Sequence, residues 1–149
     1  MAIKNFAAFS EMIGTGGQPT DEDLQTAAED GYQEIINLAT YDKDPDMAKR
    51  EEKAAVELGM GYHSIPVVWD NPLRTDFDEF AACMRSLRGK KVLVHCAANY
   101  RATAFAALYG IVDQGLSEDK ADEFIRSIWN PAKFPEWDRL ISEIKSSVE

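Results

Sequence analysis

The segment from His95 to Thr103 holds the residues of this sequence that are best suited to chemistry. Cys96 is followed by four residues and then by Arg101, and the segment joins an apolar run at 91–95 to a long apolar stretch at 101–114. Backbone amides at a strand-to-helix turn bind anions, and the same field favours the thiolate of a cysteine. Arg101 adds a planar fork that suits phosphate. We therefore predict a nucleophilic Cys96 in an anion-binding loop.

The competing interpretation is a small buried cysteine with Arg101 on the surface. The strand, loop and apolar helix around the two residues favour the functional interpretation. His95 is expected to orient backbone groups beside the nucleophile, in a buried and hydrogen-bonded position. Thr103 is expected to hydrogen-bond the cysteine sulfur. The predicted phosphate-binding residues are Ala97, Ala98, Asn99, Tyr100, Arg101, Ala102 and Thr103.

Turn residues divide the chain into alternating strands and helices. Such an order implies right-handed crossovers and a mainly parallel sheet of about four to five strands flanked by helices, an α/β fold. Ligands of such sheets bind beyond the carboxyl ends of the strands, where Cys96 is expected. The length of 149 residues predicts a single domain over residues 1–149. The predicted strands are 9–13 at the edge, 34–38, 62–68 and 91–95, and the predicted helices are 21–29, 45–58 after Asp44, a helix capped by Thr75 that ends near Leu87, 101–114, 118–129 after Ser117, and one from Pro135 onward.

The charge of the chain restricts its partners. Sixteen Lys and Arg against 26 Asp and Glu give a net charge of −10. This excess argues against sequence-independent nucleic-acid binding and against an anionic membrane surface. No apolar run approaches the roughly 18 residues of a membrane span, and the N-terminus lacks the apolar core of a signal peptide. A cytoplasmic protein is predicted, and any anion site in it must be local.

The other cysteine and histidine carry no predicted chemistry. The two cysteines, Cys83 and Cys96, make no disulfide framework, and the two histidines lack metal-ligand spacing from them. No metal and no cofactor is expected. Cys83 is predicted to pack in the core, with redox pairing to Cys96 as the alternative. His63, in a strand, is predicted to be structural.

The loop resembles the signature of the cysteine-dependent protein tyrosine phosphatase superfamily, which is His-Cys, five residues, then Arg and Ser or Thr between a strand and a helix. Upstream, Gly16-Gly17-Gln18-Pro19-Thr20 and Tyr62-His63-Ser64-Ile65-Pro66-Val67 are similar to the bacterial phosphatase-like family called beta-lactamase hydrolase-like. The resemblance covers roughly residues 3–115. It implies a phosphatase-like fold, attack of Cys96 on phosphorus, phosphate binding by Arg101, and a phosphorylated small molecule or phosphoprotein as the substrate.

The spacing between the cysteine and the arginine departs from that signature. Four residues separate Cys96 from Arg101 instead of five, and Ala102 falls where the signature arginine belongs. A pocket that binds phosphate without turnover is therefore an alternative. Four-residue spacing is also similar to the loop of rhodanese-like sulfurtransferases, in which the cysteine carries a persulfide. The Asp-x-Arg strand and the Gly-His-Ile-Pro-Gly-Ala stretch of that family are missing from this sequence.

Phosphoryl transfer through a cysteine also needs a general acid. In the superfamily this acid usually lies on a loop after the preceding strand, and the resemblance therefore implies Asp70. The alternatives are Asp76 and Asp78, which helix capping after Thr75 also explains. Arg74 either adds positive charge over the pocket or lies on the surface. Trp69 and Tyr100 are predicted to wall an aromatic slot.

Overall fold

A five-stranded sheet organises the computed structural model, which describes residues 1–148. The strand order is β1-β2-β5-β3-β4, in which β1 is antiparallel to β2 and the other neighbours are parallel. The predicted α/β fold with a mainly parallel sheet is therefore confirmed. The strands are β1 (Ala7–Ala8), β2 (Ile13–Gly16), β3 (Glu34–Asn37), β4 (Gly61–Ser64) and β5 (Val92–His95), and the helices are α1 (Asp21–Glu29), α2 (Met47–Glu57), α3 (Arg74–Ser86), α4 (Tyr100–Gln114), α5 (Glu118–Arg126), the short 3₁₀ helix Pro131–Lys133 and α6 (Pro135–Ser146).

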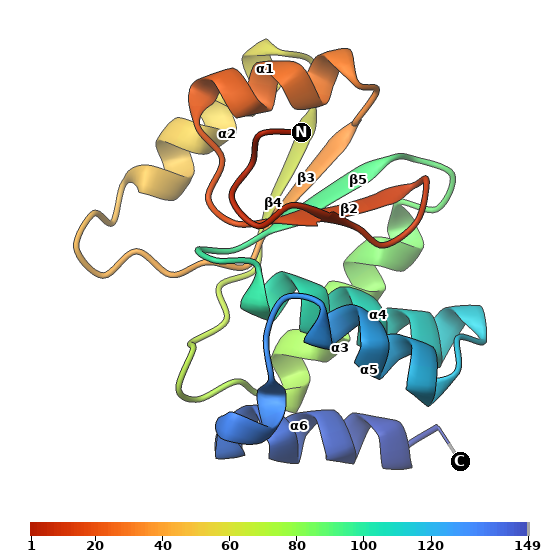
Figure 1. The fold of residues 1–149 in the computed structure, drawn as a ribbon. Helices are drawn as coiled ribbons and strands as arrows, with labels where there is room; N and C mark the ends of the chain where they lie inside the picture. Colours follow the sequence, from red (N-terminus) through yellow and green to blue (C-terminus); the bar gives the residue numbers. More distant parts are fainter. Residues whose placement is uncertain (149) are drawn as a thin grey trace.

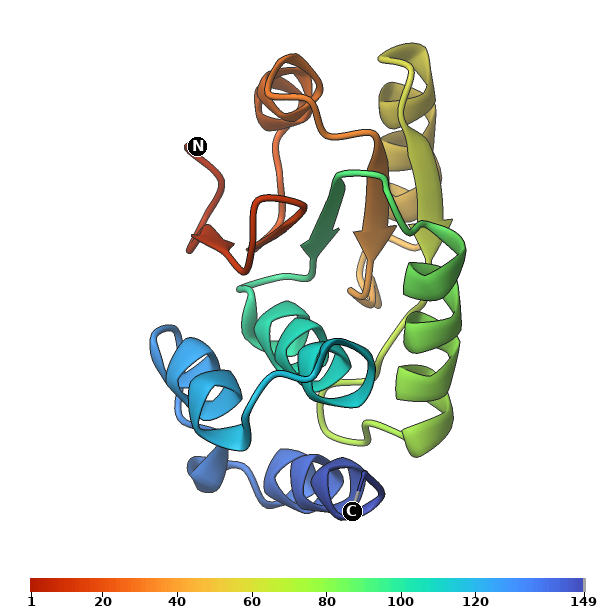
Figure 2. The same cartoon turned by 90° about the vertical axis from the view of Figure 1, so that its right-hand side faces the viewer.

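Helices cover both faces of the sheet (Figures 1 and 2). α1 and α2 pack on one face, where Leu24, Ala27 and Ala55 meet Ile35 and Leu93 of the central strands. α3 to α6 cover the other face, and α6 is the helix farthest from the sheet in Figure 1. Residues on successive positions of β3 and β5 therefore face opposite cores, as expected for strands buried on both sides.

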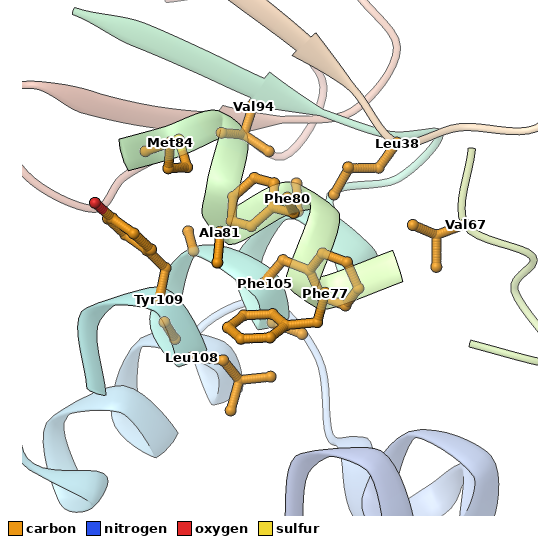
Figure 3. Close-up of a cluster of buried hydrophobic side chains, with 14 of the residues drawn as sticks. Leu38, Val67, Phe77, Phe80, Ala81, Met84, Val94, Phe105, Leu108 and Tyr109 are labelled. Carbon is orange, nitrogen blue, oxygen red and sulfur yellow. The ribbon is translucent and has the colours of Figure 1, made fainter. Parts of the chain in front are cut away.

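The larger core lies between the sheet and the helices α3 and α4. Figure 3 shows Phe77 and Phe80 of α3 facing Phe105 of α4, and both ring-centroid distances to Phe105 are 5.5 Å. Residues 101–111 of α4 are all buried, which agrees with a helix whose sequence is apolar almost all round. The helix that follows Cys96 is therefore held on every side, and its N-terminus is a rigid support for the loop.

The strand predicted at residues 9–13 is wrong. Residues 9–12 form the turn between β1 and β2, in which Ser10 Oγ accepts hydrogen bonds from the amides of Met12 and Ile13 at 3.2 Å. β2 instead runs through Ile13–Gly16, a glycine-rich stretch that is typical of a strand end. Glycine is required there by packing, because a Cβ on Gly16 would lie 2.6 Å from Ile3 Cγ2.

Three helix boundaries also differ from the predicted ones. α3 begins at Arg74, and the carboxylate of Asp76 accepts the amide of Leu73, so Thr75 is not its cap. α2 begins at Met47 and not at residue 45. α5 ends at Arg126, three residues before Trp129. Helix ends depend on local capping hydrogen bonds, which hydrophobic periodicity does not report.

The carboxyl ends of the four parallel strands lie at the same edge of the sheet. In the strand register, Gly16 of β2 and Asn37 of β3 both pair with His95 of β5, and Ser64 of β4 pairs with Asn37. The strand predicted at 62–68 is too long, because β4 ends at Ser64 and is followed by Ile65 and Pro66, which has no amide hydrogen for a strand ladder. The amides of Ile65 and Val67 still donate to Asn37 O and Leu38 O. The segments that follow all four strands therefore meet beside Cys96.

Candidate active site

Cys96 lies directly after β5 at the floor of a pocket. The residue is 1% exposed, and the pocket has a volume of about 310 Å³. The pocket is lined by Trp69, Cys96, Ala97, Ala98, Tyr100, Arg101 and Phe134. Five of these seven residues belong to the predicted loop, so the sequence segment singled out for chemistry forms most of one cavity wall.

Hydrogen bonds fix the direction of four consecutive carbonyl groups in the loop. The carbonyl and amide groups of one trans peptide unit point in opposite directions, and no described peptide bond is cis. A carbonyl held by the surrounding protein therefore turns the amide of the next residue the other way. The partners are His95 Nδ1 at 3.3 Å from Cys96 O, the Gln18 amide at 3.0 Å from Ala97 O, Asn5 Nδ2 at 3.1 Å from Ala98 O, and Thr103 Oγ1 at 2.8 Å from Asn99 O.

The amides of residues 97, 98, 100, 101 and 102 have no acceptor within the part of the chain that the structure describes. The amide of Asn99 instead faces Gly16 O in the antiparallel bridge between Gly17 and Ala98. Backbone amides without an acceptor are costly unless an outside group pairs with them. Such free donors beside a cysteine and a helix N-terminus make a site for an anion.

Asn99 gives the loop its turn. Its backbone is in the left-handed region, with a φ of 72°, directly before the first residue of α4. Asn99 Nδ2 donates to Asn5 O at 2.7 Å and to Thr15 Oγ1 at 3.1 Å. Asparagine tolerates this backbone better than most residues, and its side chain ties the turn to β2 and to the N-terminal segment.

The Gly-Gly-Gln stretch after β2 supports the loop from the opposite side. A Cβ on Gly17 would lie 2.7 Å from Ala97 O, so glycine allows the two backbones to approach. The amide of Gln18 then reaches Ala97 O, while its side-chain Nε2 donates to Glu51 Oε1 at 2.7 Å. This sequence motif therefore has a structural role at the cysteine loop.

Arg101 lies in the first turn of α4 and lines the pocket, although it is only 6% exposed. Its Nη1 donates to Val67 O at 2.7 Å, which ties the cysteine loop to the segment 65–73 between β4 and α3. A guanidinium has five donors, and this is its single hydrogen bond found among the described residues. The four-residue spacing thus leaves Arg101 beside the pocket with donors to spare.

Aromatic side chains form the rest of the pocket. Trp69 and Tyr100, the two predicted walls, have ring centroids 5.8 Å apart, and Phe134 lies 5.1 Å from Trp69. Trp129 stacks on Tyr100 at 5.0 Å with an angle of 2° between the rings. No sequence motif connects Phe134 or Trp129 with the site, because both follow α5 and lie far from the cysteine motif in sequence.

Five predicted site residues are not among those that line the pocket: Asp70, Ala102 and Thr103, together with His95 and Asn99. Asp70 is exposed and next to Trp69, but it is not among the pocket-lining residues. Ala102 and Thr103 are fully buried. The Thr103 hydroxyl donates to Asn99 O and Tyr100 O and accepts a hydrogen bond from Trp129 Nε1. These bonds support the loop, whereas the predicted hydrogen bond from Thr103 to the Cys96 sulfur is not among them. Ala102 and Thr103 face the buried interface of α4, whereas Asp70 lies exposed in the connection between β4 and α3.

His95 forms a buried pair that the sequence analysis did not find. His95 Nε2 lies 2.5 Å from Glu51 Oε2, and the two side chains are 0% and 2% exposed. Burial alone would raise the pKa of Glu51, but the hydrogen bond from His95 and its charge outweigh this effect, and the pKa lies below its ordinary value. The signal in the sequence was a glutamate on the inner face of an amphipathic helix, at a position where an apolar residue is usual.

The remaining candidate residues take structural roles in the described chain. Cys83 packs against the larger core, and burial raises the pKa of its thiol. His63 Nε2 lies 2.8 Å from Glu34 Oε1. Asp78 pairs with Arg74 at 3.1 Å on the surface of α3.

Residues 1–148 contain neither a cluster of metal-binding side chains nor a membrane-spanning helix. No group of three or more His, Cys, Asp or Glu side chains in this range is placed to hold a metal ion. None of the helices in this range is both long enough and apolar enough to cross a membrane.

One protein family and two solved structures that are similar to this chain are all described as phosphatases. Residues 7–134 match the family described as DSP-PTPase phosphatase fused to NAD+ kinase. A crystal structure from Shewanella putrefaciens CN-32, described as a candidate phosphatase, is 34% identical, with a TM-score of 0.89 over 99% of this chain and 92% of that one. The active form of the phosphatase Tk-PTP shares the fold at 18% identity, with a TM-score of 0.75 over 95% of this chain and 96% of that one.

The curated relatives are longer proteins. Beta-lactamase hydrolase-like protein from two strains of Xylella fastidiosa is 29% identical over 115 residues, which is 76% of this chain and 26% of the relative. The chain thus spans about a quarter of the length of these relatives. The family match extends over most of the sequence and includes the Cys96 loop, the Gly-Gly-Gln stretch and the helices around them. On this basis the chain belongs to the DSP-PTPase phosphatase family.

Proposed function

We propose that this protein hydrolyses phosphate monoesters through a phosphocysteine intermediate on Cys96. The observation that carries the proposal is the set of loop amides around this cysteine, at residues 97, 98, 100, 101 and 102, for which residues 1–148 offer no acceptor, with the guanidinium of Arg101 beside them. Such donors stabilise the charge on the oxygens of a phosphoryl group during its transfer. Membership of a phosphatase family agrees with this chemistry.

The proposed reaction has two steps. Cys96 Sγ attacks phosphorus as a thiolate, the S–P bond forms, and the P–O ester bond breaks while Asp70 gives a proton to the leaving oxygen. A water molecule then attacks the phosphocysteine, Asp70 takes a proton from this water, and the S–P bond breaks to release inorganic phosphate and the thiolate. The attachment of the segment that carries Asp70 supports this role, since Val67 O accepts a hydrogen bond from Arg101 Nη1 and Trp69 O accepts one from Trp137 Nε1.

The proposed substrate is a phosphorylated small molecule or a phosphoprotein. Two proteins with this fold have been crystallised with such groups, TpbA with pTyr and PTPMT1 with PI(5)P. In this chain, the rings of Trp69, Tyr100 and Phe134 around the pocket suit a flat, apolar group next to the phosphate. Aryl phosphates are therefore the appropriate first substrates.

Substitution of the cysteine tests the proposal. The wild type is expected to hydrolyse 4-nitrophenyl phosphate in a vanadate-sensitive reaction, and Cys96→Ser is expected to abolish it because the serine hydroxyl is a far weaker nucleophile at neutral pH. Cys83→Ser is the matched control, because it changes the other cysteine outside the pocket. Equal activity of the wild type and Cys96→Ser would contradict the mechanism.

A second experiment addresses the general acid. Asp70→Asn is expected to slow phenyl phosphate, which has a poor leaving group, by about 10²-fold or more, and 4-nitrophenyl phosphate much less. Asp78→Asn is the control, because this aspartate is also exposed but pairs with Arg74. Equal effects of Asp70→Asn on both substrates would remove Asp70 from the mechanism.

A phosphate-binding protein without turnover is the second candidate. The exposed position of Asp70 outside the pocket wall and the use of Arg101 Nη1 by Val67 O favour it. Thermal stabilisation of the wild type by phosphate or vanadate, together with no hydrolysis of either aryl phosphate, would select this candidate.

A further inference from the structure

The two ring nitrogens of His95 both face oxygen acceptors. Nε2 lies 2.5 Å from Glu51 Oε2, and Nδ1 lies 3.3 Å from Cys96 O. A neutral imidazole carries a single N–H donor, so it can satisfy only one of these oxygens, whereas the imidazolium donates to both. The geometry of the contacts therefore indicates a ring with two protons, provided that Glu51 is ionised.

The surroundings of Glu51 indicate that it is ionised. Besides His95, three donors reach its carboxylate, and hydrogen bonds to a carboxylate favour the charged form. The three donors are Gln18 Nε2 at 2.7 Å, Tyr62 Oη at 2.8 Å and Asn37 Nδ2 at 3.3 Å.

We propose that Glu51 is a positioning residue that keeps His95 doubly protonated behind the nucleophile. The imidazolium then holds Cys96 O, and because this carbonyl shares a trans peptide unit with the amide of Ala97, it turns that amide away from the ring. Ala97 lines the pocket. The cation also adds a positive charge one residue from the thiolate, next to the positive ends of the loop amides. This proposal rests on the proposed role of Cys96 as a nucleophile.

Four other titratable groups lie near this pair: Tyr41, Tyr62, Cys96 and Arg101. Tyr62 of β4 donates to Glu51, and Tyr41, after β3, is linked to the same carboxylate through Asn37. Burial raises the pKa of Tyr62, and burial raises the pKa of Tyr41 to about 12, so both hydroxyls keep their protons near neutral pH. Arg101 of α4 acts on Tyr41 electrostatically, and Cys96 follows His95. The sole anion among these partners of His95, other than the proposed thiolate, is Glu51.

The protonation of His95 can be measured directly in the wild type. The chain has two histidines, and a His63→Gln variant identifies their signals in a ¹⁵N spectrum of the imidazole nitrogens. We expect both nitrogens of His95 to carry protons at pH 7. One unprotonated nitrogen of His95 at that pH would overturn the proposal, and this measurement needs no substitution in the buried pair.

The effect on the nucleophile is measured by alkylation with iodoacetamide. In a Cys83→Ser background Cys96 is the single cysteine, and the rate of its alkylation against pH gives the midpoint of thiolate formation. Glu51→Gln keeps the shape of the side chain and removes its charge, and we expect the midpoint to rise by about one pH unit. Glu52→Gln, which removes a charge from the exposed side of the same helix, is the matched control and is expected to leave the midpoint unchanged.

These outcomes are separate from those that test hydrolysis. A folded Glu51→Gln protein with the midpoint of the wild type would overturn the inference, even if the wild type hydrolyses aryl phosphates. A higher midpoint in Glu51→Gln together with two protons on His95 would support it, even if no phosphate ester is turned over. If Glu51→Gln does not fold, the imidazole spectrum of the wild type decides.

Discussion

At the residue scale, Asn99 combines two requirements that few side chains meet together. Its φ of 72° is a left-handed conformation, which costs most residues about 1–2 kcal/mol. Glycine adopts it freely but has no side chain with which to donate to Asn5 O and Thr15 Oγ1. Asparagine therefore supplies both the turn and its attachment to β2.

Substitution of Asn99 separates these two contributions. Asn99→Gly and Asn99→Ala both lose the side-chain hydrogen bonds, but only alanine is strained in the left-handed conformation. We expect Asn99→Ala to be less stable than Asn99→Gly by about 1 kcal/mol in urea unfolding, and both to be less stable than the wild type. Equal stabilities of the two variants would show that the backbone has relaxed to another conformation.

At the element scale, the site depends on three segments that hold the loop from outside. The stretch after β2 lies against the loop at Gly17, and the amide of Gln18 donates to Ala97 O. The segment 65–73 is attached to the loop by the hydrogen bond from Arg101 to Val67 O. This segment is in turn held by α6, through the hydrogen bond from Trp137 Nε1 to Trp69 O at 2.8 Å. The loop is thus positioned by its neighbours more than by its own residues. A substitution outside the loop should therefore alter anion binding.

Gly17→Ala tests this dependence. The new Cβ would lie 2.7 Å from Ala97 O and 3.1 Å from Lys4 O, and both are backbone atoms that can move only with their segments. We expect a loss of about 1–3 kcal/mol in stability and weaker binding of phosphate, measured by titration calorimetry.

Gly110→Ala is the matched control for this experiment. Its Cβ would also be crowded, at 2.7 Å from Phe9 Cζ, but Phe9 does not line the pocket. We expect this variant to lose stability and to keep its affinity for phosphate. Equal phosphate affinity of Gly17→Ala and the wild type would contradict the role given to this approach.

At the scale of the whole molecule, the anion site proposed at Cys96 lies in an acidic protein. The net charge is −10, and the donors at the pocket are the loop amides and Arg101. The field of the molecule should therefore repel substrates that carry several negative charges beyond the phosphate.

Ionic strength tests this effect. Added salt screens exposed charges beyond a distance of about 10 Å at 0.1 M. We expect the ratio of kcat/KM for an aryl phosphate with extra carboxylates to that for 4-nitrophenyl phosphate to rise with NaCl concentration. The comparison of two substrates cancels effects of salt on the shared phosphate site, and a constant ratio would contradict the expectation.

The pair of Glu51 and His95 also links the stability of the whole molecule to pH. The pKa of Glu51 is below its ordinary value of 4.5 in the folded protein, so the stability that it contributes is present above about pH 4.5 and is lost as the pH falls through the lower folded value. At pH 7, Glu51→Gln is expected to be less stable by about 3 kcal/mol, because it leaves a buried partner without its counter-charge.

Urea unfolding at several pH values checks this linkage. The difference in unfolding free energy between the wild type and Glu51→Gln is expected to shrink as the pH is lowered below about 4.5. Glu52→Gln provides the comparison with an exposed glutamate of the same helix. A difference that stays constant down to pH 3 would show that Glu51 is not a carboxylate in the folded protein.

The amino-acid sequence was sufficient to predict the fold class, the family resemblance, the place of Cys96 at the end of a buried strand and that of Arg101 at the start of the next helix. These features are local: apolar runs, helix periodicity and the spacing of a motif are all contained in short segments. The same reasoning placed the first strand wrongly, because glycines that serve close packing of β2 are typical of a turn when they are seen in sequence alone.

The tertiary structure decided which side chains support the loop. Glu51 lies 44 residues before His95, and Asn5 lies 93 residues before Ala98, so no local pattern relates them. Glu51 reaches His95 because β3, which precedes α2, pairs with β5, and Asn5 reaches the loop because β1, which follows it, pairs with β2 on the other side of β5. The sequence specifies the proposed nucleophile through a short motif, whereas the groups that surround it are assembled by the order and register of the strands.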